Sequence, residues 1–254
     1  MKFNQRVVGI GNVVCDMYYQ DNQLIGISGG QTTSNILFNL AVMGVRTKLI
    51  GSVGDDIYGE IATDSLSRVK VNLSGVKVLK QATTTWHISV INNKGINSRK
   101  CPYCALKRKY VLQYEHIKDA LSGINDNDII IIDQLNDVTL AVIEQYSNKS
   151  FFDFGYPDIL IDITKKELIK MISNKFEIIN MNNVVFEYIQ DKFNLSELEL
   201  AKLLNIKLLI VTKGKAGADF IFDDKLISKM AAPVTEIENN GAVICFVQLS
   251  SNII

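Results

Sequence analysis

Short apolar runs alternate with stretches of helical periodicity along most of the chain. Runs rich in Val, Ile and Leu lie at 6–11, 47–53, 128–133 and 206–211, and segments with apolar residues three or four positions apart separate them. Continuous apolar strands separated by helices are typical of a mostly parallel sheet that is covered on both faces. The pattern therefore predicts an α/β fold with a central, mostly parallel sheet flanked by helices.

Shorter strand-like stretches interrupt this pattern in 17–27 and 76–91, on either side of polar turns. We expect them to form a small antiparallel β lid over the sheet. A chain of 254 residues can bury one large core, and it contains no internal repeat or low-complexity linker. Residues 1–254 are therefore expected to form a single domain.

Composition narrows the function classes. Lys and Arg together number 27, as do Asp and Glu, so the net charge is zero and nothing favours nucleic acid or a membrane surface as partner. No apolar run is long enough to span a bilayer, and the first residues lack the apolar core of a signal peptide. Four cysteines with one close pair do not form a disulfide framework. We expect a cytoplasmic protein.

Candidate binding residues follow the predicted strands. Asp16 comes after the first strand, and ligands of open α/β sheets bind at the carboxyl ends of strands. A glycine-containing loop, 28–34, then leads into a helix whose start carries Asn35. Near the other end of the chain, Gly241 is placed to open a helix, where backbone N–H groups would attract an anion. Ile244, however, stands where phosphoryl transfer would need a proton acceptor.

Three groups of residues resemble signatures of the ribokinase-like PfkB carbohydrate kinases. The first signature is matched by Gly29-Gly30, Asn35, Ala41, Gly44, Gly51, Gly54-Asp-Asp56 and Gly59; the nucleotide-side turn by Thr212, Gly214, Gly217 and Ala218; and the second signature by Glu238-Asn-Asn-Gly241-Ala242. The order and approximate spacing agree from residue 7 to residue 242. Within the family, Gly11-Asn12, Asp16, Tyr18 and Phe152-Asp-Phe154 look most like fructoselysine kinases.

The resemblance implies a ribokinase-like fold that uses ATP and Mg²⁺ to phosphorylate a hydroxyl of a sugar or fructosamine. It also implies a homodimer formed through the lid, and it assigns no protein metal ligand. The residues that it implies are Asp16, Gly29, Gly30 and Asn35 for the sugar, Asn182, Thr212, Gly214 and Gly217 for the nucleotide, and Gly241 and Ala242 for the anion hole.

Several departures from the family pattern bear on activity. Asn182-Asn-Val-Val185 keeps the Asn of the family's metal-side Asn-x-x-Glu motif but has Val185 in place of the Glu, and Glu238 replaces the first Asp of the second signature. Val243-Ile244 replaces the final Gly-Asp, which removes the catalytic base, and we expect the closing helices of the family to be missing. Loss of a general base costs roughly 10²–10⁴-fold in rate. We therefore predict little or no kinase activity, with a sugar- or nucleotide-binding pseudokinase as the alternative.

The genetic code offers an explanation for the lost base. Inserting one G before the codons of Val243-Ile-Cys-Phe-Val-Gln248 permits Gly-Asp-Met-Phe-Cys-Ala, which restores the family signature. Our hypothesis is that residues 243–254 are an out-of-frame tail. Resequencing the gene across the Gly241 codon tests it, because a downstream frame without family-like helices would refute it.

Other chemistry-bearing residues have plainer interpretations. Cys101-Pro-Tyr-Cys104 resembles a redox dithiol beside basic residues, but it lacks the strand-then-helix context of that fold, and a zinc site would need two more ligands. A thiol redox protein stays a distant alternative to a basic surface loop near the sugar site. His87 and His116 are isolated and are expected to be packing or surface residues. Trp86 is expected to pack, with the sugar pocket as its alternative place.

Overall fold

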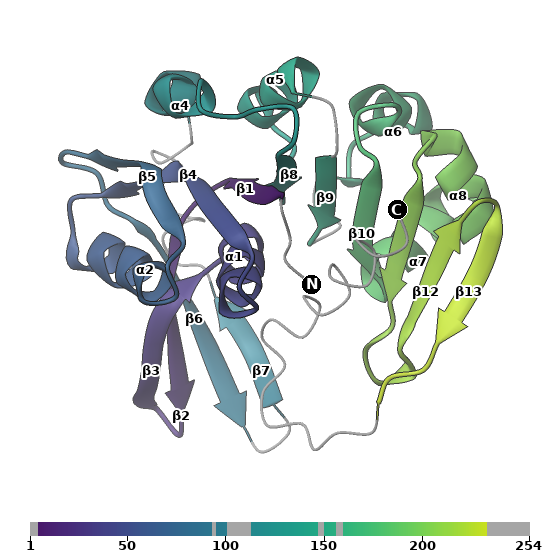
Figure 1. The fold of residues 1–254 in the computed structure, drawn as a ribbon. Helices are drawn as coiled ribbons and strands as arrows, with labels where there is room; N and C mark the ends of the chain where they lie inside the picture. The colour runs from purple at the N-terminus through teal and green to yellow at the C-terminus, as the bar shows by residue number, and fades with distance from the viewer. Residues whose placement is uncertain (1–4, 93–94, 101–112, 147–149, 156–159, 233–254) are drawn as a thin grey trace. The chain divides into compact units, whose positions relative to one another are not determined.

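The computed structural model describes residues 5–92, 95–100, 113–146, 150–155 and 160–232. Within them the chain forms two compact units, the first ending at Asp128 and the second beginning at Ile129 (Figure 1). The α/β class expected from the apolar pattern is confirmed in both units. In the part of the chain that the structure describes, no helix is long and apolar enough to cross a membrane.

Among the described residues, the first unit contains a parallel three-stranded part of the main sheet, in the order β1, β4, β5, with three helices around it. Gly44 ends the first of these helices with a φ of 84°, as its position after the last apolar residue predicts. The strands are β1 (Arg6–Ile10), β4 (Arg46–Gly54) and β5 (Asn72–Leu79), and the helices are α1 (Thr32–Val42), α2 (Ile57–Arg68) and α4 (Tyr114–Leu121).

Helices α1 and α4 cover opposite faces of β1 and β4. A Cβ on Gly9 would lie 2.5 Å from Thr33 and 2.7 Å from Leu37, so α1 packs directly on the backbone of β1 there. Lys48 is one residue out of step with Gly9 across the β1–β4 pair, and its side chain reaches Ala120 of α4. Because successive residues of a strand face opposite sides, the two helices sandwich the sheet.

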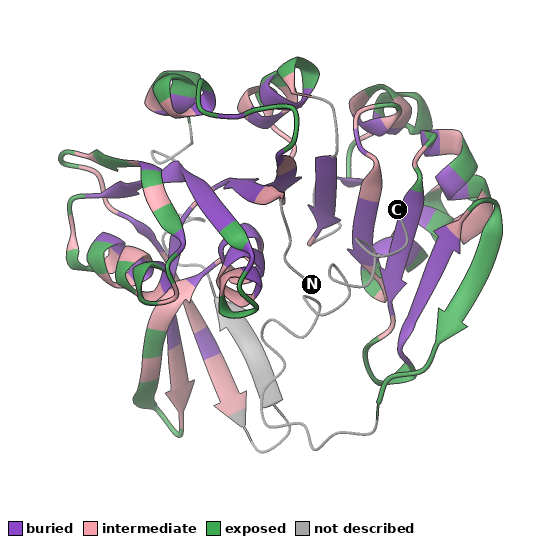
Figure 2. Ribbon diagram, viewed as in Figure 1, coloured by how far each residue is buried: buried purple, intermediate pink, exposed green. Residues whose placement is uncertain are grey.

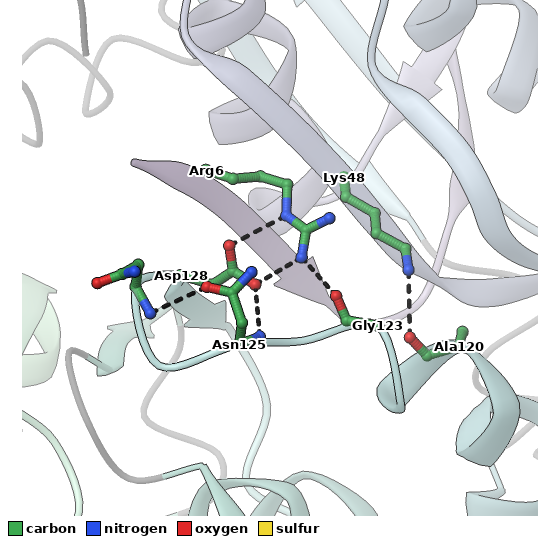
Figure 3. A network of polar contacts seen from close by, with 7 residues as sticks. Arg6, Lys48, Ala120, Gly123, Asn125 and Asp128 are labelled. Carbon is green, nitrogen blue, oxygen red and sulfur yellow. Dashed lines mark hydrogen bonds and ion pairs between the residues drawn. The ribbon is translucent and has the colours of Figure 1, made fainter. Parts of the chain in front are cut away.

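A network of polar contacts fastens the loop after α4 to β1 (Figure 3). Arg6 donates to both carboxylate oxygens of Asp128, at 3.1 Å from Nε and 2.5 Å from Nη2, and also to the carbonyl of Gly123. Lys48 Nζ donates to the carbonyl of Ala120, 3.1 Å away, and burial lowers its pKa. Both cations therefore satisfy carbonyl groups at the end of α4, where positive charge is favoured.

The first unit also carries the small sheet that was expected as a lid. Its order is β3-β2-β6-β7, with antiparallel pairs at both edges and a parallel pair, β2 with β6, in the centre. The assignment of 76–79 to the lid was wrong, because that segment pairs with β4 in the main sheet. The strands are β2 (Val14–Gln20), β3 (Gln23–Gly30), β6 (Thr85–Asn92) and β7 (Gly95–Lys100).

The second unit holds four parallel strands followed by an antiparallel hairpin, in chain order across the sheet. Helix α7 packs on β10 and β11, and α8 packs on β11 and β12. The strands are β8 (Ile129–Ile132), β9 (Ser150–Phe154), β10 (Ile178–Asn182), β11 (Leu208–Thr212), β12 (Ala218–Phe222) and β13 (Lys225–Lys229), and the helices are α5 (Asp137–Gln145), α6 (Lys165–Ile172), α7 (Asn183–Phe193) and α8 (Glu197–Leu204).

Burial in the second unit follows this strand order (Figure 2). Every residue of β9 is buried, and Phe152 lies between Phe154 and Phe176 with ring centroids 4.5 Å and 5.2 Å apart. Every residue of the edge strand β13 is exposed, including Leu226 and Ile227. The core of this unit is therefore built on the central strands.

Candidate functional site

Asp16 lies in β2 with its carboxylate held on two sides. It is only 4% exposed, and its Oδ1 is 3.1 Å from Nδ1 of His87, the residue that pairs with it across the β2–β6 ladder. A Cβ on Gly30 would lie 1.9 Å from Asp16 Oδ2. Gly30 is therefore glycine because the carboxylate occupies the place of a side chain, and the structure brings these two predicted sugar residues into contact.

Gly29 faces the other side of the same small sheet. A Cβ there would lie 2.5 Å from the carbonyl oxygen of Ala62 in α2 and 2.4 Å from Ser65 Oγ, which accepts a hydrogen bond from Gly29 N. Gly29 thus lets β3 pack against α2. The two glycines therefore have different roles: Gly29 allows β3 to pack against α2, and Gly30 leaves room for the carboxylate of Asp16.

The same alternation separates Trp86 from His87. Trp86 pairs with Cys15, which in turn pairs with Gly29 on the α2 side, and its ring lies 5.9 Å from that of Tyr58 in α2. The expectation that Trp86 packs is confirmed. The expectation for His87 was incomplete, because its ring is directed at Asp16 and belongs to the candidate site.

Asn35 occupies the first turns of α1, the helix that begins two residues after Gly30. Its backbone N–H donates to the carbonyl of Gln31, and its own carbonyl accepts from Asn39 Nδ2 at 2.9 Å. Gln31 precedes the helix with a φ of 82°, a conformation that costs a non-glycine residue energy and is common near functional sites. The turn at Gln31 therefore fixes the position of Asn35, whose side chain is partly exposed.

The Gly54-Asp-Asp motif ties the main sheet to the small one. Asp56 caps α2 by accepting from Gly59 N at 2.9 Å, and its other oxygen accepts from Thr84 N at 2.8 Å. The hydroxyl oxygen of Thr84 in turn accepts a hydrogen bond from Gly54 N at 2.9 Å. These three hydrogen bonds form a compact group that we call the knot. Since Thr84 immediately precedes β6, the knot fixes the start of β6 and therefore the position of His87. The motif therefore builds the frame of the site.

Asn182 caps a helix in the second unit. Its Oδ1 accepts from Val185 N at 3.0 Å, and its Nδ2 donates to the carbonyl of Gly155 at 3.0 Å. Both ends of the carboxamide are thus used inside the protein, at the carboxyl end of β10. Asn182 shapes the end of that strand and the start of α7.

The turn after β11 holds the other predicted nucleotide residues. Thr212 is buried at the strand end, and Gly214 follows with a φ of 56° and open space where a Cβ would be. Gly217 has a φ of 99°, and a Cβ there would collide with the carbonyl of Lys229. Gly214 therefore offers an open backbone surface that a ligand could approach, whereas Gly217 closes the hairpin. Lys213, which lies directly before Gly214, pairs with Asp219 and Glu197.

Asp153 is a buried carboxyl group with no predicted role. It accepts from Asn180 Nδ2 at 2.6 Å in the middle of the sheet, while Asn180 Oδ1 is without a partner among the described residues. Burial raises the pKa of Asp153 to about 7, and the charge of Asp133 adds to this. A protonated Asp153 has an O–H to donate, and Asn180 Oδ1 is an acceptor that lacks a donor.

Several predicted residues lie outside the described residues: Gly241, Ala242, Val243, Ile244, Cys101 and Cys104. Their predicted roles stay predictions. Across residues 5–232, where the structure describes them, no three His, Cys, Asp or Glu side chains are grouped so as to hold a metal ion. Mg²⁺ that arrives with nucleotide phosphates needs only one or two protein carboxylates, so the site does not require such a group.

Comparison with known proteins matches residues 22–242 to the model of the pfkB family carbohydrate kinases. A stretch of 68 residues is 35% identical to an uncharacterized sugar kinase, YeiI, of Escherichia coli (strain K12) and covers 27% of this chain and 19% of that protein. Another, of 84 residues, is 33% identical to an ATP-dependent ribose-1-phosphate kinase of Halopiger xanaduensis and covers 30% of this chain and 28% of that one. Each match thus spans less than a third of the relative's length.

Solved structures agree over far more of the chain. A fructokinase of Xylella fastidiosa with bound ATP matches with a TM-score of 0.78 at 17% identity, over 96% of this chain and 80% of that one. A fructokinase of Vibrio cholerae bound to fructose, ADP and calcium gives 0.76 at 18%, over 96% and 82%. A putative ribokinase of E. coli gives 0.69 at 17%, over 95% and 83%. The fold is therefore ribokinase-like, and the family match over most of the sequence shows that the chain belongs to the pfkB family of carbohydrate kinases.

Proposed function

We propose that this protein is built to transfer a phosphoryl group from ATP to a hydroxyl of a sugar or fructosamine. The observation that carries the proposal is the Asp16 carboxylate, fixed between His87 and the backbone of Gly30. A carboxylate held in one orientation can accept hydrogen bonds from two neighbouring hydroxyls of a sugar. Asn35 adds a carboxamide that both donates and accepts, on the helix that follows Gly30.

The nucleotide is proposed to meet the second unit at the turn after β11. Gly214 gives open backbone at the carboxyl end of a parallel strand, a usual place for ligands of α/β sheets. ATP would supply the γ-phosphoryl group there, with Mg²⁺ offsetting its charge. The protein's part is positioning: Thr212 and Gly214 border the nucleotide, and Gly241 and Ala242 offer backbone N–H groups to the phosphate.

The missing base limits this chemistry in the chain as it stands. Ile244 has no group that accepts a proton from the attacking hydroxyl, so we infer that the chain still binds sugar although its catalysis is impaired. The pseudokinase alternative rests on the same residue. The impaired kinase and the pseudokinase differ in how they respond when the family residues are restored. Only an impaired kinase regains turnover when an aspartate replaces Ile244.

The test compares the wild type with Val243→Gly/Ile244→Asp in an ATP-turnover assay. D-fructose, D-ribose, ribose 1-phosphate and fructoselysine are the candidate acceptors, the last following the fructoselysine kinase resemblance. We expect the double variant to exceed the wild type by roughly 10²–10⁴-fold with one acceptor. Wild-type turnover at about 1–100 s⁻¹ would refute the impairment. Sugar binding without turnover in either protein would favour the pseudokinase.

A homodimer through the small sheet is part of the same proposal. The edge strand β3 exposes three large apolar side chains, and its outer edge is unpaired among the residues that the structure describes. An edge of this kind invites pairing with another chain. Leu24, Ile25 and Ile27 are 52%, 53% and 40% exposed. A second copy of this chain would cover them.

A further inference from the structure

The ring of His87 is directed at the carboxylate of Asp16. The two residues face each other across the parallel β2–β6 pair, with Nδ1 3.1 Å from Oδ1. Their side chains are 14% and 5% exposed, so water competes little for this bond. A hydrogen bond to a buried carboxylate is charge-assisted and roughly twice as strong as one between neutral groups.

We propose that His87 is a positioning residue that fixes the Asp16 carboxylate for sugar binding. The inference rests on the proposed function. Donation from Nδ1 occupies Oδ1, and the backbone of Gly30 lies against Oδ2. Rotation of the carboxylate is thereby blocked from both sides before any sugar arrives. A site that is already ordered loses less entropy on binding, which raises affinity without a new contact.

Donation does not depend on the charge of the ring. Nδ1 carries a proton in imidazolium and in one of the two neutral tautomers, so the bond requires only that this tautomer be selected when the ring is neutral. The carboxylate itself selects it, because Asp16 offers only an acceptor at this position.

The backbone around His87 supports such a role. β6 starts at Thr85, directly after Thr84, which Asp56 and Gly54 hold from the start of α2 and the end of β4. On the opposite face, Trp86 packs against Tyr58 of α2. The strand that carries His87 is therefore anchored to the main sheet just before the residue. The ring's position is set by the same knot that frames the sugar site.

The test uses two substitutions that differ in one donor. In His87→Asn, the Nδ2 amide lies as many bonds from Cα as Nδ1 does in histidine and can still donate to Asp16. His87→Leu keeps the bulk and removes the donor. The full-length proteins are titrated with D-fructose, D-ribose and fructoselysine by calorimetry. For the sugar that binds the wild type, we expect His87→Leu to lower the affinity by about tenfold or more. His87→Asn should recover most of this loss of affinity.

A second measurement needs no sugar. Ring ¹⁵N spectra of the wild type should show His87 with its proton on Nδ1, and Asp16→Asn should change that signature. Equal sugar affinity in the wild type and His87→Leu would overturn the proposal. So would a ring spectrum that does not respond to Asp16→Asn. If no sugar binds the wild type, the proposed function fails, and the spectrum alone decides whether His87 holds Asp16.

Discussion

Single residues in this protein have roles that depend on which face of a strand they occupy. Gly29 and Gly30 are adjacent, yet a side chain on the first would strike the backbone of α2 and on the second the carboxylate of Asp16. The family resemblance predicts that both contact the sugar. It could not distinguish them, because their roles are set by contacts with residues far away in the chain.

The two glycines are expected to respond differently to substitution. Gly30→Ala places a methyl group where Asp16 Oδ2 lies and should reduce sugar affinity at least tenfold, because the carboxylate must move. Gly29→Ala meets the rigid carbonyl of Ala62 and should instead cost about 1–3 kcal/mol of unfolding free energy. Calorimetric titration and thermal unfolding of both variants measure this. Equal losses of affinity in the two would contradict the assignment of faces.

Asp153 predicts a pH dependence of stability. Since burial raises its pKa to about 7, the folded chain keeps a proton that the unfolded chain releases near pH 4. The unfolding free energy should therefore fall as the pH rises from about 4 to about 7. Asp153→Asn stays neutral and should remove this fall, which is at most about 4 kcal/mol for a shift of about three units. Urea unfolding at pH 5 and pH 8 measures both proteins. An identical pH dependence in the two would refute the buried-acid account.

At the scale of elements, the Gly54-Asp-Asp motif connects three segments. The motif was recognised in the sequence as a family signature, but its structural role was not, because Thr84 lies 28 residues from Asp56. The helices and main strands were largely predictable from apolar periodicity. The strands of the lid were less predictable, because strand pairing joins segments that are distant in the sequence. Residues 76–79 in fact pair with β4 in the main sheet.

Asp56→Ala should loosen the start of β6 as well as α2. It removes the cap of α2 and the acceptor for Thr84 N, so we expect a loss of about 1–3 kcal/mol and faster amide exchange at Thr84 to His87. Asp55→Ala is the matched control, since Asp55 accepts only the exposed N–H of Gln81 among the bonds that the structure describes. Exchange at β6 that is unchanged in Asp56→Ala would argue against the knot.

The exposed edge of β3 carries the dimer proposal. Ile25→Lys/Ile27→Lys places two charges on the apolar edge and should convert a dimer to a monomer, as measured by light scattering coupled to gel filtration. Leu226→Lys/Ile227→Lys on the exposed strand β13 is the control and should leave the mass unchanged. A wild type that is monomeric at all concentrations would remove the proposal.

At the scale of the whole molecule, the fold and the family are the best-determined features. Periodicity predicted the parallel sheet, and three ordered signatures pointed to the family that the match over residues 22–242 establishes. Within the candidate site, position and resemblance single out Asp16 and Gly30 as candidates, and the structure brings the two into contact. His87 was not, because an isolated histidine in a strand gives no sign of its partner until the register of β2 and β6 is known.

Sugar binding to an ordered Asp16 is the central claim, and calorimetric titration of the wild type against Asp16→Ala tests it most directly. With D-fructose, D-ribose and fructoselysine as probes, we expect one sugar to bind the wild type and to lose at least about 100-fold in affinity when the carboxylate is removed. Both proteins should melt cooperatively, so that the loss reflects the site. The same affinity in both proteins, or no binding of any of the three sugars to the folded wild type, would contradict the account.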